Sequence, residues 1–285
     1  MAAGGRHSLA ISADGRLWAW GSNQYGQLGL GDREDRGIPE RVPGFGPGTD
    51  LKAVGISTGY EHSLVIVHSV DGISSLYSMG RGQDGRLGID EFEDALSPTA
   101  APVADKFSHQ PPGHVSHVAA GRHHSIAFAP QVDPTSGLDE ALAEPPKFPH
   151  PPIFACGANS YGQLAIGDSG ERHEWCFFVG MRGKFIHHLE RDGCAMLTAG
   201  SEYSVCVTKR GGVWVCGRGD GGQLGSGHAA LMKDYGKMPA TAIFHFQEVG
   251  GGGGELLTES FLHGRLDARS HPPSVVYEDV LYTKR

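Results

Sequence analysis

Short apolar segments alternate with glycine-containing turns along most of the chain. The first two such segments, residues 8–12 and 17–20, alternate between apolar and polar positions or stay apolar over four to five residues. Asp14-Gly15 between them is a hairpin signal, because this dipeptide accepts the backbone angles of a tight turn. Neither segment repeats its apolar positions every three to four residues, as a helix would. The pattern therefore predicts short antiparallel strands and an all-β protein.

The same unit occurs four times. Its first half reads AGGRHS at 3–8, TGYEHS at 58–63, AGRHHS at 120–125 and AGSEYS at 199–204. Its second half reads WGSNQYGQLG at 20–29, MGRGQDGRLG at 79–88, CGANSYGQLA at 156–165 and CGRGDGGQLG at 216–225. A recurring unit of this length is typical of propellers and solenoids, in which neighbouring units share one core.

The recurrences define the domain organisation. Residues 1–228 form four tandem repeats at about 2–53, 54–117, 118–196 and 197–228 plus a following strand. A proline-rich and acidic stretch at 130–152 interrupts the third copy and is predicted to be a surface loop, because proline cannot donate to a strand ladder. Residues 229–285 are divergent and glycine-rich, and 274–283 look like a degenerate fifth start.

Glycine, histidine and asparagine recur at matching places, which indicates structural roles. These positions are Gly4, His7, Gly21, Asn23, Gly26, Gly59, His62, Gly80, Gly82, Gly85, Gly121, His124, Gly157, Asn159, Gly162, Gly200, Gly217, Gly219 and Gly222. Asn and Gly share the place of Asn23, Gly82, Asn159 and Gly219, so a left-handed turn residue is expected there. The histidines are expected to be buried and hydrogen-bonded to backbone.

The unit resembles the repeat of the regulator of chromosome condensation family. The first copy matches through Gly4, His7, Ser8, Trp20, Gly21, Asn23, Gly26, Gln27, Leu28 and Gly29. Later copies replace the tryptophan with Met79, Cys156 and Cys216, the histidine with Tyr203 and the last glycine with Ala165. The resemblance implies a β-propeller of four-stranded antiparallel blades. With four clear copies, we expect a partial or open propeller of about four to five blades.

Composition restricts the partners and the setting. The net charge of −8 makes nucleic acid an unlikely ligand, since nucleic-acid binders show a basic excess. The five cysteines include no C-x-x-C pair, and no apolar run has the length of a signal peptide or membrane span. We therefore expect a reduced, intracellular protein of cytoplasm or nucleus that does not enter membranes.

Motifs that could carry chemistry are better explained as parts of the repeat. Residues 80–85 and 217–222 both fit G-x-G-x-x-G, but a dinucleotide site needs a helix directly after the glycines, and a Leu-Gly step follows instead. The His-Ser neighbours point to opposite faces of a strand, so they are not catalytic pairs. We expect no catalytic residue, no cofactor and no metal site.

The polar loops after the Leu-Gly steps are the candidate binding segments. Their candidate residues are Arg33, Glu34, Asp35, Glu91 and Asp94, together with the insertion at 130–152. We expect a non-enzymatic scaffold for protein–protein interaction. Two alternatives stay open from the resemblance. One is a guanine-nucleotide exchange factor for a small GTPase, and the other is the propeller fragment of a larger ubiquitin ligase.

Overall fold

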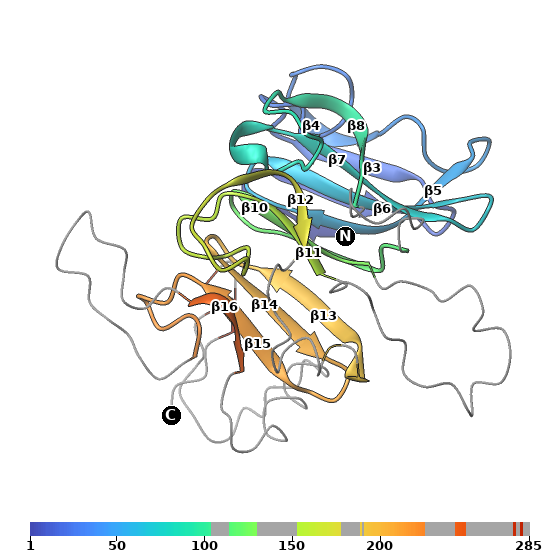
Figure 1. Ribbon diagram of the computed structural model, residues 1–285. Coiled ribbons are helices and arrows are strands. Elements are labelled where there is room, and N and C mark those ends of the chain that lie inside the picture. Colours follow the sequence, from blue (N-terminus) through green and yellow to red (C-terminus); the bar gives the residue numbers. More distant parts are fainter. Residues whose placement is uncertain are drawn as a thin grey trace, which may run out of the picture.

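A computed structural model of the chain describes residues 1–103, 114–129, 153–177, 189, 191–225, 243–248, 276–277 and 280–281. Within these residues, four antiparallel sheets of four strands follow one another (Figure 1). The insertion at 130–152 and most of 229–285 lie outside the described residues. In the divergent segment, β17 (Val276–Tyr277) and β18 (Val280–Leu281) pair as two short strands.

Each sheet is an up-and-down meander in chain order. The first contains β1 (Ala2–Ala3), β2 (His7–Ile11), β3 (Leu17–Gly21) and β4 (Arg36–Arg41). The second contains β5 (Leu51–Thr58), β6 (His62–Ser69), β7 (Ser74–Gly80) and β8 (Ala95–Ala101), with a 3-10 turn η1 (Gln83–Gly85) before β8. The third contains β9 (His117–Ala120), β10 (His124–Phe128), β11 (Ile153–Gly157) and β12 (Arg172–Phe177). The fourth contains β13 (Cys194–Ala199), β14 (Tyr203–Thr208), β15 (Val213–Gly217) and β16 (Ile243–Glu248).

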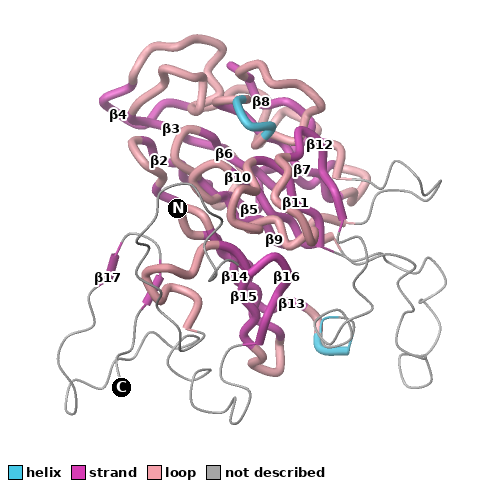
Figure 2. Tube along the Cα trace, turned by 60° about the vertical axis from the view of Figure 1, so that its left-hand side comes forward, coloured by secondary structure: helices cyan, strands magenta, loops and turns pink. Residues whose placement is uncertain are grey.

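The sheets stand beside one another as consecutive blades, here called blades 1 to 4. The first strands β1, β5, β9 and β13 contact each other in order, and β5, β9 and β13 can be followed in Figure 2. Residues of these four strands line a groove of about 220 Å³. Apolar side chains fill the space between blades: Leu9 and Leu17 of blade 1 pack with Val65 and Val67 of blade 2. The all-β propeller fold expected from the repeats is confirmed.

The left-handed turn residues do not lie where the sequence suggested. Positive φ occurs at the glycine that ends each third strand: 104° at Gly21, 110° at Gly80, 106° at Gly157 and 108° at Gly217. It recurs at Gly26, Gly85, Gly162 and Gly222. None of the four predicted positions has positive φ, and Gly82 has a φ of −86°. That prediction was wrong.

Asparagine is used for its side-chain hydrogen bonds. In Asn23, Nδ2 donates to the Asp32 carbonyl at 3.0 Å and Oδ1 accepts from the Leu28 amide at 2.9 Å. Asn159 repeats both bonds in blade 3. At Gly82 a Cβ would lie 1.9 Å from the Glu93 carbonyl oxygen, so glycine is required by close approach. The Asn/Gly alternation thus has two separate causes, neither of them a left-handed backbone.

Buried histidines link each blade to the next. The Nε2 atoms of His7, His62 and His124 lie 2.8, 3.0 and 2.9 Å from the hydroxyls of Ser63, Ser125 and Ser204 in the following blade. Those hydroxyls donate in turn to the backbone carbonyls of Gln27, Arg86 and Gln163 in the preceding blade. Burial is as expected, but a serine takes the place of the expected backbone partner and relays the bond to a carbonyl.

The hydrogen bonds from histidine to serine to carbonyl, here called the relay, determine which ring nitrogen of each histidine carries the proton. The serine proton is used on a carbonyl, so the serine oxygen must accept, and the histidine must carry its proton on Nε2. Nδ1 is then bare, and it is buried without a hydrogen-bond partner at His7, His62 and His124. This edge of each ring lies against a glycine: a Cβ on Gly59 would fall 2.2 Å from Cε1 and 2.5 Å from Nδ1 of His62. Glycine before x-x-His is therefore required by the ring.

The third-strand glycine should be sensitive to substitution. Gly21→Ala places a Cβ 2.5 Å from the Arg6 carbonyl oxygen at a φ of 104°. We expect the free energy of unfolding to fall by about 2–3 kcal/mol, measured by chemical denaturation. Gly37→Ala is the matched control, because its Cβ meets nothing within 4 Å. An equal effect of both substitutions would contradict this explanation.

The relay should make stability depend on pH. Burial lowers the pKa of His7 to about 4, below the value of 6.5 in an unfolded chain. The unfolded state therefore binds the proton first, so stability is intact above pH 6.5 and falls as the pH drops towards 4. In His7→Gln the amide still donates to Ser63 but does not titrate. We expect the slope of unfolding free energy against pH, measured between pH 6 and 4.5, to decrease by about 1 kcal/mol per pH unit. An unchanged slope would show that His7 is not neutral in the folded state.

Candidate protein-interaction face

Two sets of loops emerge at the same end of the blades. Adjacent strands are antiparallel, so the loop after each first strand and the loop after each third strand share one edge. These loops are residues 4–6, 59–61, 121–123 and 200–202, and 22–35, 81–94, 158–171 and 218–225. We call this surface the repeat-loop face. The glycines and histidines described above hold its loops in place.

Three tyrosines on this face are each covered by an arginine of the next blade. The guanidinium carbon of Arg81 lies 4.5 Å from the centre of the Tyr25 ring, and that of Arg218 lies 5.0 Å from the Tyr161 ring. Arg122 lies 4.9 Å from the Tyr60 ring. Such pairs combine a planar cation with an aromatic face and are mutually attractive. They align side chains of successive blades along the face.

Carboxylates orient two of these arginines. Arg81 binds Glu61 at 2.7 Å, and Arg218 binds Glu202 at 2.6 Å. The bond to Glu61 is the largest cause of the raised pKa of Arg81, which stays charged. Blades 2 and 4 thus share a Glu-and-Arg pair, whereas blades 1 and 3 supply the tyrosine on which the arginine stacks. The face therefore has a two-blade alternation in addition to the one-blade repeat.

Blade 2 also carries a fully buried arginine. Arg86 takes the place of Gln27 and Gln163, and its side chain is 0% exposed. Its Nε donates to the Gln83 carbonyl at 2.8 Å, and its terminal nitrogen pairs with Asp84 at 2.6 Å. Asp84 has a φ of 63°, an unusual value for a residue with a side chain. In blades 1 and 3 the glutamine at this position accepts a hydrogen bond from its turn. An arginine can only donate, and in blade 2 the acceptor is Asp84 of the same turn.

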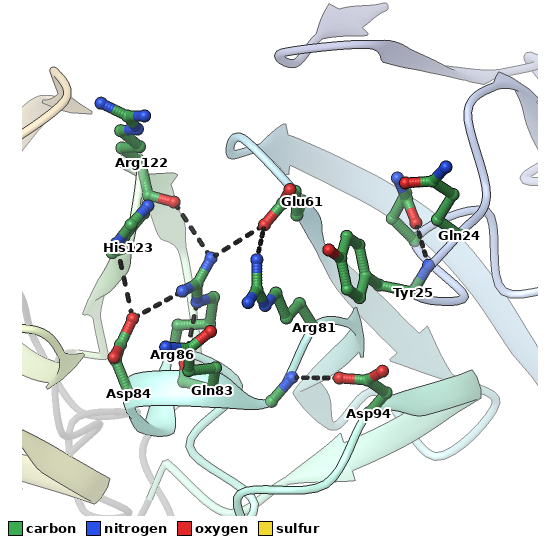
Figure 3. Close-up of polar contacts among 12 residues, drawn as sticks. Gln24, Tyr25, Glu61, Arg81, Gln83, Asp84, Arg86, Asp94, Arg122 and His123 are labelled. Atoms are coloured by element: carbon green, nitrogen blue, oxygen red, sulfur yellow. Dashed lines mark hydrogen bonds and ion pairs between the residues drawn. The ribbon is translucent and has the colours of Figure 1, made fainter.

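His123 lies at the edge of this network, 3.4 Å from Asp84 (Figure 3). Burial lowers its pKa, and the charge of Arg86 lowers it further against the pull of Asp84. The ring is therefore neutral at physiological pH. Two arginines, Arg81 and Arg86, are balanced by Glu61 and Asp84. The group orders the loops and presents hydrogen-bond donors and aromatic edges to whatever contacts the face.

The structure divides the predicted binding residues into two groups. Asp35 accepts from the Asn23 amide at 2.7 Å, and Asp94 accepts from the Gly82 amide at 3.1 Å, so both stabilise turns. Arg33 bridges blades 1 and 2 through Asp94 at 2.8 Å. Glu34 and Glu91 are exposed to solvent. All five lie on the repeat-loop face.

The inserted loop attaches at the other end of the blades. Residues 130–152 lie outside the described residues, but the strands on either side are described. Phe128 pairs with Ile153 at the end of the hairpin away from His124 and Gly157. The insertion and the acidic loops, both predicted to bind partners, therefore start from opposite ends of the propeller.

Sequence reasoning missed the Tyr–Arg pairs. The signal was present: arginine follows the third-strand glycine in copies 2 and 4, and tyrosine precedes the next glycine in copies 1 and 3. Aligning all four copies on a single unit hid this alternation. Among the described residues, no three His, Cys, Asp or Glu side chains are placed to hold a metal. In this part of the chain, no helix is long and apolar enough to span a membrane.

Comparison with known proteins supports a repeat protein of one family. Residues 14–66 and 74–128 match the model of the regulator of chromosome condensation (RCC1) repeat. The ultraviolet-B receptor UVR8 of Arabidopsis thaliana is 29% identical over 229 residues, which are 80% of this chain and 43% of the receptor. The probable E3 ubiquitin-protein ligase HERC3 of Homo sapiens is 35% identical over 167 residues, 59% of this chain and 13% of the ligase.

A solved structure has the same fold. The crystal structure of human WBSCR16 superposes with a TM-score of 0.60 at 18% identity and covers 89% of this chain and 54% of that chain. The chain spans less than half the length of the curated relatives named here. The matched segments include Asn23, which orders its turn in blade 1, and the contact between His62 and Ser125 that links blades 2 and 3. Two segments of the chain, residues 14–66 and 74–128, are therefore identified as RCC1-type repeats.

Proposed function

We propose that this chain is a docking module that binds an acidic segment of a partner protein on the repeat-loop face. The RCC1-repeat architecture provides the general role, a propeller-type domain for protein interaction. The observation that carries the specific proposal is the row of three Tyr–Arg stacks that crosses the blade boundaries on this one face. Tyrosine and arginine are enriched among the residues that dominate binding energy in protein interfaces.

The surroundings of Arg122 indicate which chemical group of a partner this face would bind. Its side chain is exposed and stacks on Tyr60, and it forms no ion pair with any carboxylate among the described residues. Arg81 and Arg218, in contrast, are already paired with Glu61 and Glu202. A held, unpaired guanidinium recognises a carboxylate with two parallel hydrogen bonds. We therefore propose that the partner places an Asp or Glu side chain over Arg122.

Substitution of Arg122 should weaken partner binding while leaving the fold intact. The partner is first captured from cell extract with the whole chain and identified, and its affinity is then measured with purified components. We expect Arg122→Ala to raise the dissociation constant about ten- to thirtyfold. Arg122→Lys keeps the charge but loses the planar stack, and its effect should be intermediate.

Val70→Ala is the matched control, because Val70 is 73% exposed in the loop between β6 and β7, at the opposite end of blade 2. It should leave the affinity unchanged. Weaker binding by Val70→Ala with normal binding by Arg122→Ala would place the partner on the other end and contradict the proposal.

The two alternatives are distinguished by a separate assay. We propose docking without nucleotide exchange, so the chain should leave the rate of GDP release from purified small GTPases unchanged. Acceleration that is lost in Arg122→Ala would instead support an exchange factor acting through the same face. The ligase alternative predicts a fused catalytic domain, and sequencing of the complete transcript tests it.

A further inference from the structure

The loop at residues 89–94, which leads into β8 of blade 2, differs from its counterparts in blades 1 and 3. In those two blades an aspartate holds its own loop together by accepting hydrogen bonds from an asparagine and an arginine. These residues are Asp32, Asn23 and Arg36 in blade 1 and Asp168, Asn159 and Arg172 in blade 3. The matching positions in blade 2 hold Glu91, Gly82 and Ala95. The asparagine and the arginine are both absent there, so the loop of blade 2 cannot be held in the same way.

Other contacts hold the loop of blade 2, and they come from both neighbouring blades. Asp94 accepts from the Gly82 amide at 3.1 Å and pairs with Arg33 of blade 1 at 2.8 Å. On the other side, the Asp90 amide donates to the His173 carbonyl of blade 3 at 3.3 Å. The loop is therefore fixed between blades 1 and 3 without the internal network of its counterparts.

This arrangement leaves Phe92 at the surface. Phe92 is 52% exposed, and it is the most exposed aromatic residue in the part of the chain that the structure describes. Its ring packs on His173 with the ring centres 5.2 Å apart, and His173 lies 3.6 Å from Asp90. Blades 1 and 3 on either side are both described, so the exposure of Phe92 does not arise from a missing neighbouring blade.

Two carboxylates flank the exposed ring. Glu91 and Glu93 are exposed and form no ion pair with any described residue, whereas Asp94 is paired with Arg33. An aromatic side chain that is already held in place loses little entropy when a partner covers it, and aromatic anchors dominate the binding energy of many interfaces. Free negative charges beside the anchor favour a partner with positive charges around the place where the ring enters.

We propose that Phe92 enters an apolar pocket of the partner protein, and that lysine or arginine side chains on the rim of this pocket face Glu91 and Glu93. This inference rests on the docking role proposed above and adds a second contact on the same face. Arg122 binds an acidic side chain of the partner, whereas the loop of blade 2 binds a basic rim. The two contacts have opposite charges, so they fix the orientation of the partner on the repeat-loop face.

Site-specific photo-crosslinking in cell extract tests whether a partner covers Phe92. The whole chain carries Phe92→p-benzoylphenylalanine, which retains an aromatic ring at this position. Val70→p-benzoylphenylalanine is the matched control, because Val70 is exposed at the opposite end of blade 2. We expect position 92 to crosslink to one protein, next to basic residues of that protein. A yield at position 92 no higher than at position 70 would overturn the proposal.

The crosslinked protein is then purified, and its affinity for full-length variants is measured. Phe92→Ala should raise the dissociation constant at least about tenfold, and Phe92→Leu, which keeps an apolar side chain, should raise it less. Glu91→Gln combined with Glu93→Gln should raise the dissociation constant about three- to tenfold and make binding less sensitive to salt. Asp71→Asn removes an exposed carboxylate at the opposite end of blade 2 and should change neither quantity.

The results separate this inference from the role of Arg122. Normal affinity of Phe92→Ala, or unchanged salt dependence of the double glutamine variant, would overturn the inference even if Arg122→Ala weakens binding. Weaker binding by Phe92→Ala with normal binding by Arg122→Ala would support the inference and contradict the contact proposed for Arg122. Thermal unfolding confirms that each variant is folded, and the double glutamine variant decides the matter if Phe92→Ala is not.

Discussion

The close approach of one blade to the next is the constraint on which the other features depend. At each of three blade boundaries, one buried histidine bonds to a serine of the next blade, and that serine donates a hydrogen bond to a backbone carbonyl of the first blade. This series of hydrogen bonds forms only if the histidine is neutral and the other edge of its ring packs against a glycine. Histidine, serine and glycine are therefore required together. The same geometry holds the G-x-x-His loop, which places Tyr60 and Arg122 on the repeat-loop face.

The alternation of blades explains how a rigid repeat produces a varied surface. Positions that touch the neighbouring blade stay nearly constant, while the two residues before each histidine, or before Tyr203 in the fourth copy, differ: Tyr60-Glu61, Arg122-His123, Ser201-Glu202. They lie outside the relay, so substitution there does not break a blade boundary. Even a change inside the turn is accommodated when its partner changes with it, as Arg86 and Asp84 show. The face can therefore diverge while the scaffold remains the same.

The repeat, the all-β class and the propeller could be predicted from the sequence because short strands separated by glycine-containing turns recur along it in the same order. The site could not, for two physical reasons. Asparagine and glycine at one alignment position suggested one backbone conformation, whereas Asn23 bonds through its amide and Gly82 avoids a carbonyl. In addition, the Tyr–Arg stacks join residues more than fifty positions apart, such as Tyr25 and Arg81. Such a pairing follows from blade packing, and in the sequence it shows only as an alternation between copies, which alignment on a single unit hides.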